Sequence, residues 1–124
     1  MPYGYEMYEG TKMNIVNARE APVIDTPHKV DVRKLHDIEH VQVVHITLQP
    51  GEALKRHITP VDVTFYMLEG RGIVEVGDEK QEVGPDTLIE SPKKIPHTWY
   101  NESDAPCRFL VIKTPKPAES TRVL

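Results

Sequence analysis

The sequence contains very little cysteine. Cys107 is the single cysteine among 124 residues, so a disulfide within one chain is excluded. It lies in an apolar run, which favours a buried and unreactive side chain. Chains without disulfides are typical of reducing compartments, and we therefore expect a cytoplasmic protein.

Long apolar runs and clusters of one charge are also missing. No stretch approaches the roughly 20 apolar residues that a membrane-spanning helix needs, and residues 1–14 lack the apolar core of a secretory signal. Fifteen Lys and Arg residues accompany 19 Asp and Glu residues, for a net charge of −4. The basic residues are scattered along the chain, so neither a nucleic acid nor a membrane is expected as a partner.

Long helical segments are not expected either, because turn-forming residues divide the chain. Eleven prolines and seven glycines are spread along it, and a proline inside a helix costs about 3 kcal/mol. Short runs rich in Val, Ile, Thr, Tyr and Phe lie between them, which is typical of strands, and Gly77-Asp78 matches a two-residue hairpin turn. The sequence therefore predicts an all-β fold with strands within residues 13–16, 28–33, 41–48, 54–59, 63–68, 73–76, 79–83, 87–90, 95–101 and 107–113.

Two segments each place a histidine among similar turn residues. In the first segment, Gly51 is followed after five residues by His57, and the segment ends at Gly70. In the second segment, three residues separate His97 from Asn101. Both histidines lie in predicted strands, so we expect the two imidazoles to point into one pocket.

This pattern resembles the two motifs of the cupin superfamily, with Gly84 and Pro92 at matching positions before the second histidine. The resemblance covers roughly residues 41–113 and implies a double-stranded β-helix, which is a jelly-roll barrel. The chain would then be a single cupin domain over residues 1–124, with a barrel core at 28–113, an N-terminal arm at 1–12 and a C-terminal tail at 115–124.

The resemblance also bears on metal binding. Cupins that bind a metal usually supply two histidines and a glutamate from the first motif and one histidine from the second. Here Thr59 and Val63 occupy two of these positions, which leaves His57 and His97. Because a firmly held transition metal generally needs three or four protein donors, we expect at most a weakly held divalent metal (Fe, Mn, Ni, Zn or Cu).

Other side chains near these motifs require separate interpretation. Asp62 neighbours the glutamate position, but strand alternation turns it to the opposite face unless Pro60 resets the register. His45, on the preceding predicted strand, either points inward or packs locally. The segment His36-Asp37-Ile38-Glu39-His40 matches a zinc-protease pattern that needs a helix. It lies between two predicted strands, and we therefore exclude that function.

The pocket walls are expected from residues that share strand faces with the two histidines. Such a lining is apolar and aromatic, as in many small-molecule sites. One hypothesis is a small cupin that binds a small molecule and a divalent metal and acts as a metal-dependent dioxygenase or isomerase. The alternative is a metal-free binding or sensor module without catalysis. The predicted wall residues are Thr59, Val63, Phe65, Met67, Trp99 and Asn101.

The N-terminal arm is rich in tyrosine, a residue that is common at protein interfaces. The resemblance to small cupins that pair implies a homodimer. We therefore expect two copies to associate. The arm either crosses to its partner through Tyr3, Tyr5 and Tyr8 or is disordered.

Overall fold

The computed structural model describes residue 10 and residues 12–124, and these residues form ten strands and no helix. This agrees with the all-β prediction. A helix long and apolar enough to cross a membrane is not found in the described part of the chain. The strands are β1 (Asp31–Ile38), β2 (Val41–Leu48), β3 (His57–Ile58), β4 (Asp62–Glu69), β5 (Gly72–Val76), β6 (Glu79–Val83), β7 (Leu88–Ser91), β8 (His97–Tyr100), β9 (Cys107–Thr114) and β10 (Arg122–Val123).

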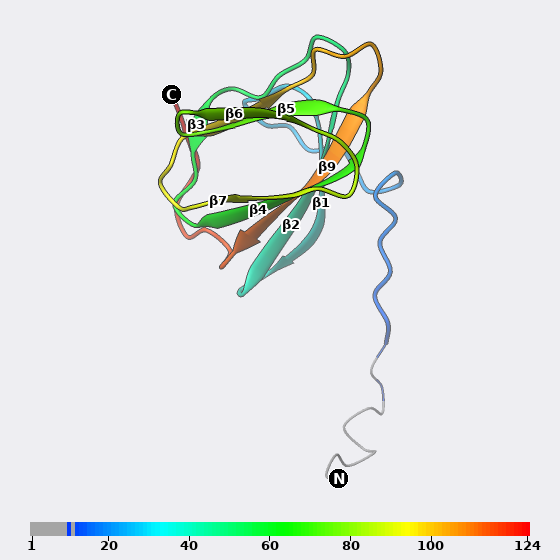
Figure 1. The fold of residues 1–124 in the computed structure, drawn as a ribbon. Coiled ribbons are helices and arrows are strands. Elements are labelled where there is room, and N and C mark those ends of the chain that lie inside the picture. The colour runs from blue at the N-terminus through cyan, green and yellow to red at the C-terminus, as the bar shows by residue number, and fades with distance from the viewer. Residues whose placement is uncertain (1–9, 11) are drawn as a thin grey trace.

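The strands form two five-stranded sheets that face each other (Figure 1). The first sheet has the order β1-β2-β9-β4-β7, and the second has the order β10-β3-β8-β5-β6. Side chains alternate between the interior and the outside, as the pleat of a strand requires. On β4, for example, Val63, Phe65 and Met67 are buried, whereas Thr64 and Tyr66 are only partly covered.

Three aromatic side chains fill one part of the interior. The Trp99 ring stacks on Phe109 with ring centroids 4.1 Å apart. Phe65 meets both rings edge-on, with centroids at 5.4 Å from Trp99 and 6.1 Å from Phe109. Aromatic pairs of this kind contribute about 0.5–1.5 kcal/mol each beyond the area they bury. These three rings therefore belong to the closely packed hydrophobic core.

The chain passes repeatedly from one sheet to the other, and each passage after β2 contains proline or glycine. Pro50-Gly51 separates β2 from β3, Pro60 separates β3 from β4, and Gly84-Pro85 separates β6 from β7. Because proline cannot donate a ladder hydrogen bond, strand pairing ends at these corners. The resulting alternation between sheets is the double-stranded β-helix topology expected from the sequence.

The predicted closure into a barrel is not observed. Within residues 12–124, none of the strands pairs with neighbours in both sheets. The corners interrupt the ladders, so each sheet keeps two edge strands and the domain is a jelly-roll sandwich. The hairpin between β5 and β6 forms as predicted, and Gly77 adopts the positive φ of 58° that its turn requires.

The N-terminal segment differs from the prediction. Residues 13–16 were expected to form a short strand, but they carry no strand. The side chains of Met13 and Ile15 are 84% and 82% exposed, because this segment extends away from the two sheets (Figure 1). The tyrosines of the predicted dimer arm, at positions 3, 5 and 8, lie outside the described residues, and the homodimer stays a prediction.

The C-terminal residues are more ordered than a tail. Val123 pairs with His57 through the β10–β3 ladder, and the Leu124 amide donates a 2.9 Å hydrogen bond to the Arg56 carbonyl. Residues 120–123 therefore lie beside the strand that carries the first motif histidine.

Candidate functional site

Two buried histidines meet between the sheets. His57 is the first residue of β3, His97 is the first residue of β8, and the two pair directly across the antiparallel strands. Their Nε2 atoms lie 2.9 Å apart, and their rings meet edge-on with centroids 4.4 Å apart. His57 is 7% exposed and His97 is 2% exposed. The fold thus joins two side chains that are far apart along the chain.

The hydrogen bonds around this pair determine where its protons lie. Nδ1 of His57 is 2.7 Å from the Lys55 carbonyl oxygen. A carbonyl can only accept, so this nitrogen carries the proton and Nε2 of neutral His57 has a lone pair. Nε2–H of His97 therefore donates to it, and the Ser91 hydroxyl donates to Nδ1 of His97 at 2.6 Å. The pair thus contains one N–H, on His97, and one lone pair, on His57, and in this structure the two bond to each other.

Burial keeps both imidazoles neutral. The pKa of His97 is lowered to about 3, first by burial and then by the electrostatic influence of His57, Lys113 and His28, since a proton on His97 would repel a charge on any of them. The pKa of His57 is also lowered by burial, although its hydrogen bond to the Lys55 carbonyl opposes this effect. Near neutral pH the pair therefore acts through hydrogen bonds rather than through charge.

His28 is a third histidine at the same place, and sequence reasoning missed it. Its ring centroid is 4.8 Å from that of His57, and its Nδ1 accepts the Lys55 amide at 2.9 Å. Burial and the neighbouring charges lower the pKa of His28 to about 4. The residue precedes β1 and lies outside both motifs, so only the folded chain reveals that it belongs here.

These histidines line a cavity of about 560 Å³ between the two sheets. Its polar side includes Lys34, Gln42, Thr59, Lys113 and Thr121. The C-terminal segment closes part of one side through Ser120, Thr121 and Val123. The apolar part of the lining consists of Ile24, Pro27, Val44, Ile46, Leu54, Phe65, Val111 and Val123.

The predicted wall residues divide into two groups. Thr59 and Phe65 line the cavity together with the two histidines. Val63, Met67, Trp99 and Asn101 are also buried, but they are not part of the cavity wall. Trp99 stacks on Phe109 and fills the interior on the far side of Phe65. A shared strand face therefore did not distinguish pocket wall from core.

Asn101 stabilises a loop rather than the cavity. Its side-chain amide donates to the carbonyl oxygens of Leu48 at 2.9 Å and Ala105 at 2.8 Å. Its side-chain oxygen accepts hydrogen bonds from the backbone and hydroxyl of Ser103. With these bonds the buried amide is fully used, and it holds the turn between β8 and β9 against the end of β2.

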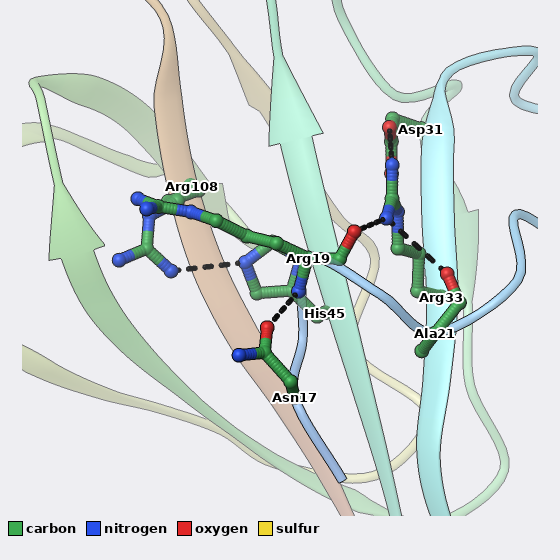
Figure 2. Close-up of polar contacts among 7 residues, drawn as sticks. All are labelled: Asn17, Arg19, Ala21, Asp31, Arg33, His45 and Arg108. Atoms are coloured by element: carbon green, nitrogen blue, oxygen red, sulfur yellow. Dashed lines mark hydrogen bonds and ion pairs between the residues drawn. The ribbon is translucent and has the colours of Figure 1, made fainter.

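His45 lies on the face of the first sheet that points away from the histidine cavity. Figure 2 shows it beside Arg108 and Arg19. Its Nε2 accepts a 3.2 Å hydrogen bond from Arg108, and the segment around Arg19 covers it. Burial and the charge of Arg108 lower the pKa of His45. A smaller cavity of about 210 Å³ adjoins this residue. The interpretation of His45 as a locally packed side chain therefore fits, and it does not join His57.

The remaining candidates also lie away from the cavity. Asp62 is exposed and accepts the Lys93 amide at 2.9 Å, so strand alternation turned it outward as expected. The segment His36-Asp37-Ile38-Glu39-His40 spans the end of β1 and the following turn and is exposed. It has no helix, so the geometry of a zinc-protease site is not formed.

The donor atoms near the histidine pair do not make a complete metal site. Among residues 12–124, no group of three or more His, Cys, Asp or Glu side chains is arranged to hold a metal ion. The Thr59 hydroxyl lies 3.4 Å from Nε2 of His97, but a neutral hydroxyl is a weak ligand. The residues present therefore do not fit a firmly held transition metal, which generally needs three or four protein donors.

Comparison with known proteins identifies the family. The cupin-domain family model matches residues 44–113, which is more than half of the chain and includes both motif histidines. The chain therefore belongs to the cupin family, in agreement with its two-sheet topology.

Individual relatives extend this picture. Protein MJ1618 of Methanocaldococcus jannaschii is 35% identical over 72 residues, which is 57% of this chain and 57% of that protein. The chain thus matches little more than half the length of this relative. TT1209 from Thermus thermophilus has 30% identity and a TM-score of 0.74, over 85% of this chain and 100% of that chain. The polyketide cyclase RemF from Streptomyces resistomycificus has a TM-score of 0.78 at 23% identity, over 91% and 86% of the two chains, which shows a common fold.

Proposed function

We propose that this cupin binds a small organic molecule in the cavity between its two sheets. The single observation that carries the proposal is the position of the neutral His57–His97 pair in a cavity of about 560 Å³ that has one apolar wall and one polar side. Small-molecule sites typically have volumes of about 300–1,000 Å³, with apolar walls and few polar groups. The cavity has the size and the composition of such a site.

The histidine pair would recognise a ligand by hydrogen bonding. The N–H of His97 and the lone pair of His57 bond to each other at 2.9 Å. A ligand hydroxyl or enol can replace this bond by accepting from His97 and donating to His57. Each such bond contributes about 0.5–1.5 kcal/mol net, so the apolar walls would supply most of the affinity and the pair would orient the ligand.

A probe of neutral charge tests this proposal. We expect 2-naphthamide to bind the wild-type protein with a Kd of about 1 mM, because a gain of about 0.3 kcal/mol per non-hydrogen atom amounts to about 4 kcal/mol for a ligand of this size. Saturable NMR shifts at the backbone amides of Thr59 and Val111 would measure it. Thr121→Trp narrows the cavity and should weaken binding at least about tenfold.

The neighbouring substitution Arg122→Trp is the matched control. Arg122 is exposed and does not line the cavity, so it should leave the Kd within about twofold. The proposal fails if neither 2-naphthamide nor the carboxylate of the same shape, 2-naphthoate, causes saturable shifts in the wild-type protein. It also fails if the two substitutions have equal effects.

A weakly held divalent metal is the second candidate, and one contact favours it. The Lys55 carbonyl fixes the proton of His57 on Nδ1, and this arrangement leaves a lone pair on Nε2, as in many metal-binding histidines. A metal there would have to replace the hydrogen bond from His97. Dioxygenase or isomerase chemistry would then need further ligands from water or substrate.

This candidate predicts a characteristic binding behaviour. Wild-type protein should take up Ni²⁺ or Zn²⁺ from solution, lose it on dialysis against a chelator, and lose the uptake in His57→Ala. His40→Ala, which changes an exposed histidine, should retain the uptake. Elemental analysis measures the metal content. Metal that survives dialysis, or uptake that persists in His57→Ala, would show that other donors hold it.

A further inference from the structure

Lys113 places an amino group in the same cavity. It lies on β9, where Cys107, Phe109 and Val111 are buried at alternate positions, so strand alternation directs Lys113 to the same inner face. Its side chain lines the cavity wall. Its positive charge is near enough to lower the pKa values of His28, His57 and His97. Lys113 and the three histidines therefore line the same cavity.

The charge of Lys113 has no counter-ion within the part of the chain that the structure describes. Lys34, which also lines the cavity, forms an ion pair with Asp37 at 3.2 Å. Asp37 also binds Lys116 at 2.9 Å. None of the ion pairs formed among these residues includes Lys113, and none of the described residues that line the cavity is an aspartate or a glutamate. The cavity therefore has a positive wall without a matching carboxylate.

An unpaired ammonium in a partly buried site is unfavourable. Burial disfavours the charged form, and the pKa of Lys113 is accordingly lowered, mainly by burial and then by Lys34. Proteins usually pair such charges, and unpaired ones are found where a ligand completes the pair. A bound anion would restore the missing partner.

We propose that the ligand of this cavity is a carboxylate, with its anionic group on Lys113 and its apolar body along the wall that ends at Phe65. This inference rests on the proposed binding function and specifies the class of ligand. A carboxylate suits a single ammonium, which acts as a point charge, whereas phosphate groups usually attract several donors or an arginine fork. The histidine pair would then contact a second polar group of the ligand.

Two probes of the same shape and different charge test the inference. We expect the wild-type protein to bind 2-naphthoate about tenfold to a hundredfold more tightly than 2-naphthamide, because hydrogen bonds to a charged group are roughly twice as strong as neutral ones. Lys113→Met should abolish this preference, so that the two probes bind the variant with Kd values within about twofold of each other. NMR titration of both probes measures the ratio.

Control variants separate the possible results. Lys93→Met removes an exposed lysine outside the cavity and should keep the wild-type ratio. Lys113→Gln provides a polar replacement should the methionine variant fold poorly, and it should also lose the preference. A ratio near one in the wild-type protein, or a ratio that survives both Lys113 substitutions, overturns the inference while the binding function stands. If neither probe binds the wild-type protein, the binding function itself fails and the inference with it.

Discussion

Acidification from about pH 7 to about pH 5 is expected to lower the free energy of unfolding by about 3 kcal/mol through His28 and His97 alone. Folding lowers the pKa of His28 from 6.5 to about 4 and the pKa of His97 from 6.5 to about 3. At a pH between the folded and the unfolded pKa of each histidine, the unfolded chain binds a proton that the folded chain excludes. The stabilisation is therefore complete above about pH 6.5 and is lost as the pH falls toward 4 and then 3.

Urea unfolding at several pH values measures this dependence. His28→Gln removes one of the two groups and should reduce the slope of stability against pH by about 1.2 kcal/mol per pH unit between pH 6 and pH 5. His40→Gln is the control, because His40 is exposed in the turn after β1, and it should retain the wild-type slope. A wild-type stability that stays constant from pH 7 to pH 5 would show that the buried imidazoles accept protons in the folded state.

Replacing Gly70 by alanine is expected to destabilise the fold by about 3 kcal/mol or more. Gly70 has a φ of +79°, which is unfavourable for a residue with a side chain. A Cβ atom there would overlap the Pro106 carbonyl oxygen and lie 2.8 Å from Cα of Cys107. Both neighbours are backbone atoms that hold the crossing from β4 to β5 against the start of β9, so they have little freedom to move.

Gly51→Ala separates the effect of the positive φ angle from the effect of the steric overlap at Gly70. Gly51 has a φ of +87°, but no atom lies within 4 Å of the position that its Cβ would take. This substitution should therefore cost only about 1 kcal/mol, from backbone strain. Chemical denaturation of both variants measures the difference. Equal costs would mean that the close approach at Gly70 relaxes without penalty and that only the φ angle matters.

The position of the turns was readable from the sequence, whereas their effect on sheet closure was not. Proline and glycine mark every passage between the sheets after β2. These turn residues predict many short strands, and the resemblance to cupins implied the jelly roll. Whether the ladders continue around a corner depends on hydrogen bonds between distant strands. The prediction of a closed barrel failed there, because the corners leave edge strands in both sheets.

The candidate site was predictable only in part. The spacing of Gly51, His57 and Gly70 marks the first motif, and strand alternation suggested Phe65 as a wall residue. The same alternation selected Met67 and Trp99 equally, but an aromatic stack occupies the interior around Trp99. Periodicity tells which side chains point inward, and it contains no information about how far the core fills the space between the sheets.

The sequence by itself determined the strand periodicity, the cupin motifs and the two histidines on which the site is centred, because these follow from residue type and local spacing. Only the tertiary structure brought His28 and Lys113 to these histidines and turned His45 to the opposite face. The physical reason is that strand register and sheet packing join residues that no local rule connects. Burial and the electrostatic environment, which set the protonation of the site, exist only once the two sheets have come together.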